Sequence, residues 1–346
     1  MDSVEDFEVV IVGAGPIGLE TAIELKAAGR EPVVLDGGAI GQQIVDFPPM
    51  TRWFSSAERL GIGGLPFVTP ASEKGTREEY LAYLRSAVAY FDIDVRTFQH
   101  VERIDTDESP RFALRARGLS GIVTSYRTST LVLATGGTAR PRVLGIPGED
   151  LPHVHTKFSE PHRYYGRRLV VVGGKNSACD AAVFAQRCGA QVTMICRGET
   201  IHPRVKYWIK PELEAMIQSG QVRALFESEV VDIDPRAVNV RVRGESGLMK
   251  IPADDVLLAI GFQSDGSLFN MVGARVEGEA GAIVHDPSTM STSVPGVYVA
   301  GTAVAGTQAR FRVYIENSHI HARRIAAAVT GGPPPDEPVY PLLPES

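Results

Sequence analysis

The sequence predicts an α/β fold made of two similar three-layer ββα units around parallel strands. Two segments support this prediction, one at residues 9–36 and the other at residues 169–197. In each, β-branched residues meet a glycine-rich turn, a helical pattern follows at once, and a second apolar strand comes after it. A chain of 346 residues is also long for one hydrophobic core. We therefore expect two Rossmann-like dinucleotide-binding domains.

The composition is that of an ordinary globular protein, with 44% hydrophobic and 22% charged residues. A net charge of −6 gives no general attraction for nucleic acid or for anionic membranes. The apolar run near the N-terminus is far too short to span a bilayer. The three cysteines, Cys179, Cys188 and Cys196, form neither a CxxC motif nor a metal-ligand spacing. We expect a cytoplasmic protein with no metal site and no nucleic-acid or membrane partner.

The first nucleotide turn covers residues 13–18, between a strand at 8–12 and a helix at 19–28. Each of its three glycines has a physical role. Gly13 permits the tight turn, Gly15 lets the backbone approach a pyrophosphate, and Gly18 lets the helix pack against its strand. The helix N-terminus attracts the phosphates.

An acidic residue completes the first unit. Asp36 follows the strand at 32–35, where a carboxylate accepts hydrogen bonds from ribose hydroxyls. Strand, turn, helix and acid together favour a dinucleotide that carries no 2′-phosphate.

The second nucleotide turn departs from this pattern. Gly173 and Ala178 occupy the first and third small-residue positions, but Lys175 stands where the middle glycine normally belongs. Arg197 replaces the acid after the second strand, and Arg204 and Lys206 follow it. A carboxylate would repel a 2′-phosphate, whereas arginine binds one through a fork of hydrogen bonds. The second unit is therefore predicted to bind NADPH.

Two nucleotide units of opposite preference are typical of a flavoprotein. The first would hold FAD and the second would bring NADPH, with hydride transfer between the two cofactors. We expect a discontinuous FAD-binding domain, residues 1–152 and 286–330, with an NADPH-binding domain, residues 153–285, inserted in it. Residues 331–346 are rich in proline and are expected to form an extended tail.

The C-terminal part of the FAD-binding domain is predicted to contain a strand at 297–300 and a long helix from about Ala309. On this helix Glu316 and His319 are one turn apart, so they could pair.

Several motifs together resemble the low-molecular-weight thioredoxin reductase group of flavoproteins. These are the two nucleotide turns, the Ala134-Thr135-Gly136 strand end, "GVYVAG" at 296–301 and "TQAR" at 307–310, and they extend over nearly the whole chain. The bacillithiol-disulfide reductase type is the most similar branch, through "FPPMTRWFSSAERLGIGGLPF", "GGKNSA" and "VKYWIKPELE".

The resemblance implies which residues hold each cofactor. It assigns FAD to Gly13, Gly15, Pro16, Gly18, Asp36, Gln43, Thr135, Gly136, Gly301, Thr302, Gln308 and Ala309. It assigns NADPH to Gly173, Lys175, Asn176, Ser177, Arg197 and Lys206. Thr302 stands where the group normally has an aspartate that touches the ribityl chain. A helix that begins near Ala309 would face the flavin ring and stabilise negative charge on its reduced form.

Two departures concern the electron acceptor. Thioredoxin reductases of this group carry a CxxC before the second nucleotide turn, but residues 148–172 contain no cysteine. The bacillithiol-type branch resembles GxGPCG in the first turn, and its single cysteine is Ile17 here. A thiolate at a helix N-terminus would attack a disulfide, whereas isoleucine has no nucleophile. Cys179 is a candidate replacement, although a small core residue is the better interpretation.

The predicted function is that of an NADPH-dependent FAD oxidoreductase, in which a hydride passes to FAD and its electrons go on without a CxxC dithiol. The acceptor could be a low-molecular-weight disulfide, ferredoxin, flavodoxin, a quinone or oxygen. A flavin- and NADPH-binding redox regulator without turnover is a further alternative. We expect a homodimer.

Overall fold

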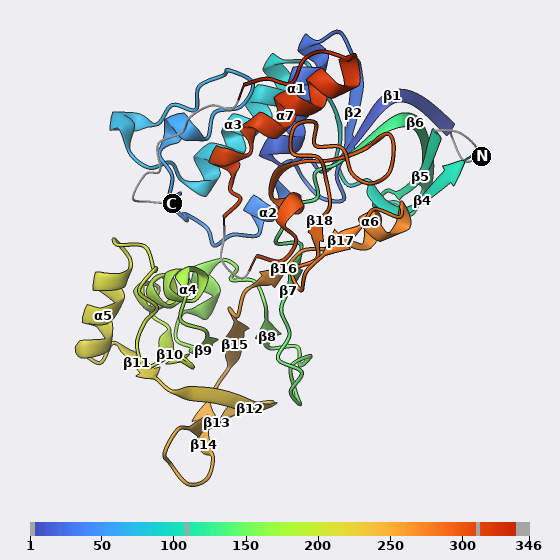
Figure 1. Cartoon of the computed structure of the whole chain (residues 1–346). Coiled ribbons are helices and arrows are strands. Elements are labelled where there is room, and N and C mark those ends of the chain that lie inside the picture. Colours follow the sequence, from blue (N-terminus) through green and yellow to red (C-terminus); the bar gives the residue numbers. More distant parts are fainter. Residues whose placement is uncertain (1–3, 108–110, 309–311, 337–346) are drawn as a thin grey trace. The chain divides into compact units, whose positions relative to one another are not determined.

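The computed structural model describes residues 4–107, 111–308 and 312–336 (Figure 1). These residues form two compact units. Unit 1 draws on residues 1–45, 52–140 and 262–346, and unit 2 on residues 46–51 and 141–261. The chain passes between the units earlier than the expected positions at 152/153 and 285/286. The reason for the second shift is that helix α6 (Ser267–Met271) and the hairpin of β17 (Val276–Glu277) and β18 (Ala282–Ile283) pack on elements of unit 1.

Unit 1 is built on one seven-stranded sheet in the order β3-β2-β1-β6-β5-β4, with β19 paired to β6. Its strands are β1 (Val4–Val12), β2 (Pro32–Leu35), β3 (Asp94–Arg96), β4 (His100–Asp107), β5 (Arg111–Arg117), β6 (Val123–Leu133) and β19 (Val297–Val299). The pairs among β3, β2, β1, β6 and β19 are parallel, whereas β4, β5 and β6 are antiparallel. Strands β4, β5 and β6 therefore form an antiparallel meander beside the parallel strands.

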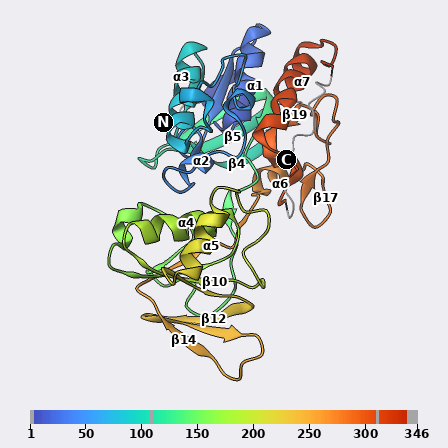
Figure 2. The same ribbon diagram turned by 90° about the vertical axis from the view of Figure 1, so that its left-hand side faces the viewer.

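Helices pack on the parallel part of this sheet. The longer helices of unit 1 are α1 (Pro16–Ala27), α3 (Arg77–Tyr90) and α7 (His319–Thr330), and the short ones are α2 (Gln42–Val45), η1 (Ala57–Arg59), η2 (Pro70–Ser72), η4 (Gly301–Ala305) and η5 (Ile315–Asn317). Helices α1 and α7 lie side by side although they come from opposite ends of the chain (Figure 2). All four residues of β2 are buried, as expected of a parallel strand covered on both faces.

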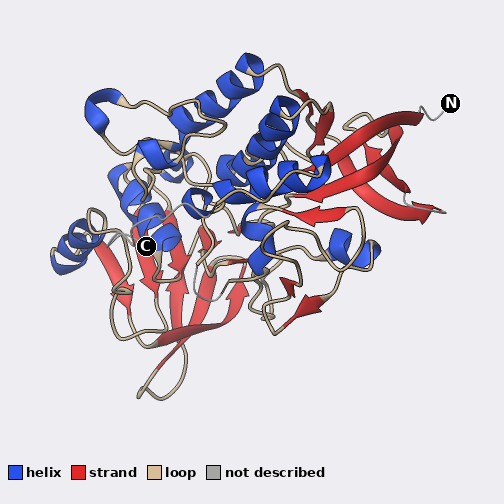
Figure 3. Ribbon diagram, turned by 45° about the horizontal axis from the view of Figure 1, so that its top comes forward, coloured by secondary structure: helices blue, strands red, loops and turns tan. Residues whose placement is uncertain are grey.

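Unit 2 repeats the arrangement in a smaller form. Its parallel sheet has the order β11-β10-β9-β15-β8, and an antiparallel sheet of β12, β13 and β14 follows (Figure 3). The strands are β8 (Val154–His155), β9 (Arg168–Val172), β10 (Gln191–Ile195), β11 (Val222–Leu225), β12 (Ser228–Asp234), β13 (Ala237–Val242), β14 (Met249–Pro252) and β15 (Asp255–Leu258). The helices are α4 (Asn176–Arg187), α5 (Lys210–Gln218) and η3 (Pro161–Tyr164), and β7 (Arg140–Pro141) pairs with β16 (Phe262–Gln263) where the chain changes units.

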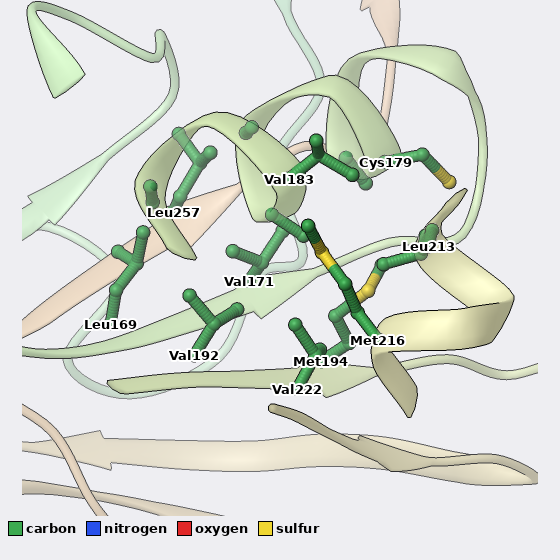
Figure 4. Packing of buried hydrophobic residues seen from close by; sticks show 14 of the residues in the cluster. Leu169, Val171, Cys179, Val183, Val192, Met194, Leu213, Met216, Val222 and Leu257 are labelled. Carbon is green, nitrogen blue, oxygen red and sulfur yellow. The ribbon is translucent and has the colours of Figure 1, made fainter. Parts of the chain in front are cut away.

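The core of unit 2 lies between its helices and the parallel sheet. Figure 4 shows the side chains that α4, α5 and the strands contribute to it, among them Val171, Val183, Met194 and Leu213. These apolar contacts place the start of α4 at the carboxyl end of β9, which is where the second nucleotide turn lies. The predicted fold class, with two Rossmann-like ββα units, is confirmed.

The C-terminal helix begins later than we expected. Helix α7 starts at His319 rather than near Ala309, and residues 309–311 lie outside the described residues. The segment before it is held by side chains instead. The Gln308 Oε1 accepts hydrogen bonds from the backbone N–H groups of Arg312, at 2.7 Å, and Val313, at 3.0 Å. These bonds give the backbone an alternative to helical pairing. Of the proline-rich tail, residues 337–346 also lie outside the described residues.

Candidate functional site

The first nucleotide turn is tightly enclosed by the protein itself. Gly13 has φ +116°, and a Cβ atom there would lie 2.3 Å from the Ala134 carbonyl oxygen. A Cβ on Gly18 would lie 1.9 Å from the Gly13 carbonyl oxygen. Both positions therefore require glycine for the contact between α1, β1 and the end of β6.

Gly15 differs from these two glycines. Its backbone is extended, with φ −76° and ψ 174°, a conformation that any residue adopts. A Cβ there would meet no atom within 4 Å. Nothing in the described protein thus requires glycine at this place, whereas a pyrophosphate next to the turn would. Pro16 follows as the first residue of α1, with its fixed φ suited to that position. The residues of the turn fit FAD.

Asp36 is positioned at the end of β2. Its carboxylate accepts hydrogen bonds from the N–H groups of Ala14, at 2.7 Å, and Gly38, at 2.8 Å. Burial raises the pKa of Asp36, although these two hydrogen bonds act in the opposite direction. The carboxylate therefore ties the turn to the second strand, and its remaining lone pairs are able to accept from ribose hydroxyls.

Gln43, on α2, holds the loop that follows β6. Its Nε2 donates to the Thr135 carbonyl oxygen at 2.6 Å, and its Oε1 accepts from the Thr138 hydroxyl at 2.7 Å. Gly136 needs its φ of +75° in this loop. The Thr135 hydroxyl is buried and has no hydrogen-bond partner among the described residues. An orphaned buried hydroxyl beside the turn is a second observation that fits a bound polar ligand.

The C-terminal segment reaches the same place. A Cβ on Gly301 would lie 3.2 Å from the Cβ of Ile17, and one on Gly137 would lie 3.3 Å from the Thr302 carbonyl oxygen. The structure thus brings the first turn together with three other residues that the sequence predicted for FAD, namely Gly136, Gly301 and Thr302. Ile17 is only 5% exposed. Gln308 is occupied in holding the loop before α7, and Ala309 lies outside the described residues.

The second nucleotide turn repeats the geometry of the first. Gly173 has φ +137°, and a Cβ there would lie 2.4 Å from the Ala259 carbonyl oxygen. The thiol of Cys196 lies beneath the turn and donates to the Gly173 carbonyl oxygen at 3.2 Å. Lys175 has an extended backbone and is the residue just before α4. Lysine is therefore compatible with the turn, and its exposed side chain adds a positive charge there.

A cluster of basic residues accompanies the second turn. Burial lowers the pKa of His202, and the nearby charges of Lys175, Arg204 and Lys210 lower it further. The His202 N–H donates to the Gly174 carbonyl oxygen at 3.2 Å, so the segment after β10 lies against the turn. Ser177 and Arg197 are exposed at the start of α4 and shortly after β10. The contribution of His202 to this cluster was not predicted from the sequence.

Lys206 is not arranged as we expected. Its amine donates to the Asp180 carboxylate at 3.0 Å, and the two residues are only 7% and 3% exposed. The expectation that its amine binds NADPH is therefore corrected, because its charge is already paired inside the protein. Asn176 is also engaged, since its Oδ1 accepts from the Lys206 backbone N–H at 2.9 Å.

Cys179 does not have the properties of a redox cysteine. It is fully buried in the core of unit 2 (Figure 4). Burial raises the pKa of the Cys179 thiol to about 12, with further contributions from Cys196 and Asp180. Nucleophilic attack requires the thiolate, so the burial and the raised pKa of Cys179 count against the redox alternative and favour the interpretation as a small core residue.

The expected pair of Glu316 and His319 does not form. His319 Nδ1 instead lies 2.6 Å from a carboxylate oxygen of Glu20 on α1, and its Nε2 lies 2.9 Å from the Arg59 carbonyl oxygen. Glu316 accepts from the Ser55 hydroxyl at 2.7 Å. Residues so far apart in the chain leave no local pattern from which this contact could have been found.

The comparisons with known proteins agree with this geometry. A family model described as pyridine nucleotide-disulphide oxidoreductase matches residues 10–301. The bacilliredoxin reductase Bdr of Bacillus subtilis (strain 168) is 35% identical over 322 residues, which are 93% of this chain and 97% of that protein. A ferredoxin–NADP reductase of Ignicoccus hospitalis is 28% identical over 299 residues, or 85% of this chain and 89% of that one.

A solved structure is similar over the same extent. The bacillithiol disulfide reductase Bdr from Bacillus cereus has a TM-score of 0.88 at 33% identity, covering 94% of this chain and 99% of that chain. Among the described residues of the present chain, no helix is long and apolar enough to cross a membrane.

Proposed function

The chain belongs to the pyridine nucleotide-disulphide oxidoreductase family, and from this premise we propose that its electron acceptor is a low-molecular-weight disulfide of the bacillithiol type. It is an FAD-dependent oxidoreductase that uses NADPH. The balanced reaction would convert NADPH, one proton and one disulfide into NADP⁺ and two thiols.

Each unit would hold one nucleotide. In unit 1, the first turn, Asp36, the Gln43–Thr135 contact and the Gly301–Thr302 segment would bind FAD. In unit 2, the second turn with Lys175, Asn176, Ser177 and Arg197 would bind NADPH, joined by the newly found His202. FAD supplies the ring that accepts a hydride and passes on two electrons. The protein binds, orients and shields the two nucleotides.

No cysteine of this chain has the properties needed to relay electrons to the disulfide. Cys179 and Cys196 are buried, and burial raises the pKa of the Cys196 thiol to about 11. Cys188 is half-buried and caps the end of α4 that is distant from the turn. Ile17 stands in the first turn, packed on Gly301. We propose direct transfer from flavin to the acceptor.

The observation that carries this proposal is the likeness to two Bdr proteins over nearly the whole length of each chain. NADPH oxidation by the purified holoenzyme should be measured with bacillithiol disulfide, and with oxidised glutathione as the control disulfide. Turnover with bacillithiol disulfide, retained in a variant in which all three cysteines are replaced by serine, supports direct transfer. Absence of turnover with either disulfide contradicts the proposal.

A second candidate function is the reduction of ferredoxin or flavodoxin. Ile17 favours it, because a one-electron carrier needs no protein thiol, and a ferredoxin–NADP reductase is 28% identical to this chain. Ferredoxin reduction by NADPH that exceeds disulfide reduction would select this alternative. Quinone or oxygen reduction belongs in the same panel. Anaerobic addition of NADPH tests the non-catalytic alternative, since an unbleached flavin would indicate a regulator.

We also propose that the protein is a cytoplasmic homodimer. Its three free thiols fit a reducing compartment. The homodimer rests on the resemblance to thioredoxin reductase-like flavoproteins alone, and light scattering on the holoenzyme in solution tests it directly.

A further inference from the structure

The buried pair of Lys206 and Asp180 lies directly behind the second nucleotide turn. Asp180 belongs to α4, one turn after its start, and Lys206 belongs to the segment between β10 and α5. Their side chains meet at 3.0 Å. Burying two charges is costly, and a buried ion pair often contributes little net stability. A role beyond stability therefore has to be considered for this pair.

Three contacts fasten the segment 202–206 to the turn. The His202 N–H donates to the Gly174 carbonyl oxygen at 3.2 Å, and the Lys206 N–H donates to the Asn176 side chain at 2.9 Å. The Lys206 amine then binds Asp180, so the segment is held to α4 by backbone and side chain at the same residue. Helices α4 and α5 lie side by side around this point (Figure 1).

The fastened segment carries two members of the basic cluster, His202 and Arg204. Between its two ends lies Arg204, which is exposed and whose backbone N–H donates to the His202 Nδ1 at 3.2 Å. The charges of Lys175, Arg204 and Lys210 all act on the His202 ring. A phosphate recognised by several such groups requires them to be held in fixed positions. The positions of His202 and Arg204 depend on the segment's attachment to α4.

We propose that Lys206 and Asp180 are positioning residues for the recognition of the nucleotide's 2′-phosphate: the buried pair holds His202 and Arg204 beside the second turn, and neither side chain binds the phosphate itself. The inference rests on the proposed assignment of NADPH to unit 2. Lys206 is then a positioning residue rather than a ligand of the nucleotide, and Asp180 is its partner in that role.

Binding of two small probes tests the proposal without turnover. Adenosine 2′,5′-bisphosphate and AMP differ in the 2′-phosphate, and calorimetric titration of the holoenzyme with each gives the preference between them. We expect Asp180→Leu and Lys206→Met each to lower this preference about tenfold, with AMP affinity unchanged. The double variant should lose no more than either single one, because both substitutions break the same contact.

Controls separate positioning from other roles. Lys206→Arg keeps the pair and should restore most of the preference. Lys250 on β14 forms an exposed ion pair with Asp234 on β12, and Lys250→Met, which removes one positive charge there, should leave the preference unchanged. The double variant, with apolar groups at both positions, keeps the experiment decisive if a single variant fails to fold.

Specific outcomes would overturn the inference. If Lys206 were a ligand, Asp180→Leu would release its amine and preserve or increase the preference. If the pair were only structural, affinity for both probes would fall together. Arg197→Ala tests the proposed function separately: a bisphosphate preference that survives it contradicts the NADPH site itself, whereas a loss there with none in Asp180→Leu contradicts only the positioning role.

Discussion

The two nucleotide turns share a backbone but differ in what they offer a ligand. Gly13 and Gly173 both have positive φ, and a Cβ on either would strike the carbonyl oxygen of an alanine that follows a neighbouring strand. At the position of the middle glycine the backbone is extended in both turns, yet one turn has Gly15 and the other has Lys175. The first turn thus offers space and the second offers charge.

The same contrast continues beyond the turns. After β2, the Asp36 carboxylate is bonded to two N–H groups of the protein, whereas the region after β10 is lined by cations. This difference agrees with the proposed assignment, in which the backbone geometry forms each nucleotide site and a few side chains select the dinucleotide.

The largest expected effect is a loss of stability on substitution of the first glycine, which both turns have. Gly13→Ala or Gly173→Ala should destabilise its unit by about 3 kcal/mol or more, because the Cβ meets a carbonyl oxygen at a positive φ. Thermal unfolding and flavin content measure the outcome. Gly15→Ala is the matched control, and it should lower FAD affinity without changing the unfolding of the FAD-free protein.

Lowering the pH should destabilise unit 1 through His321 on α7. Burial, with the charges of His285, Arg324 and His319, lowers the pKa of His321 to about 4, and its Nδ1 accepts from the Gly301 N–H at 3.2 Å. The unfolded chain binds a proton at this residue below about pH 6.5, while the folded chain does so only near pH 4. The free energy of unfolding should therefore decrease as the pH is lowered from about 6.5 to about 4, by up to about 3 kcal/mol.

Denaturant unfolding of His321→Asn measures that contribution. The variant should lose less stability than the parent protein between pH 7 and pH 4, and equal losses in both would contradict the assignment. His319 acts in the opposite sense. Burial alone would lower the pKa of His319, but Glu20 raises it, so its contribution is present below about pH 6.5 and is lost as the pH rises above the folded pKa.

Arg197→Ala should raise the KM for NADPH about 10- to 100-fold, as expected when a charge-assisted hydrogen bond is lost. The KM for NADH should stay the same, because NADH has no 2′-phosphate. Steady-state kinetics with both nucleotides provide the measurement. Arg241→Ala, at an exposed arginine paired with Glu229 in the same unit, is the control for a simple loss of charge.

Lys175→Gly makes the second turn like the first and should have the smallest effect. One exposed cation contributes about 1 kcal/mol to phosphate binding, which corresponds to about a fivefold weaker affinity for NADPH.

The reverse exchange, Gly15→Lys, should exclude FAD from the first turn. A Gly15→Lys protein that purifies with full flavin content would break the contrast between space and charge.

The sequence predicted the turns well because each is a local pattern whose glycines are required by close contacts with backbone atoms. The strand at Pro32–Leu35 matches the structure residue for residue, and Gly13, Gly18 and Gly173 have the close contacts that their roles require. Lys206 was misassigned because its burial depends on Asp180, which only the packing of α4 brings near.

The start of α7 was misplaced for a related reason. Side-chain bonds from Gln308 hold the preceding backbone, and helical periodicity alone does not reveal them. The pairing of His319 with Glu20 joins helices from opposite ends of the chain and has no local trace at all.

Unit 1 is formed by segments that lie far apart in the chain, and this has a consequence for its folding during synthesis on the ribosome. Val297 of β19 pairs with Leu131 of β6, and α7 packs on α1, so this unit is finished only after the whole of unit 2 has been translated. Unit 2 is nearly continuous in the chain and is able to fold while the remainder emerges. The early strands of unit 1 must then wait with an unpaired edge, and a nascent chain in that interval is open to chaperone capture or aggregation.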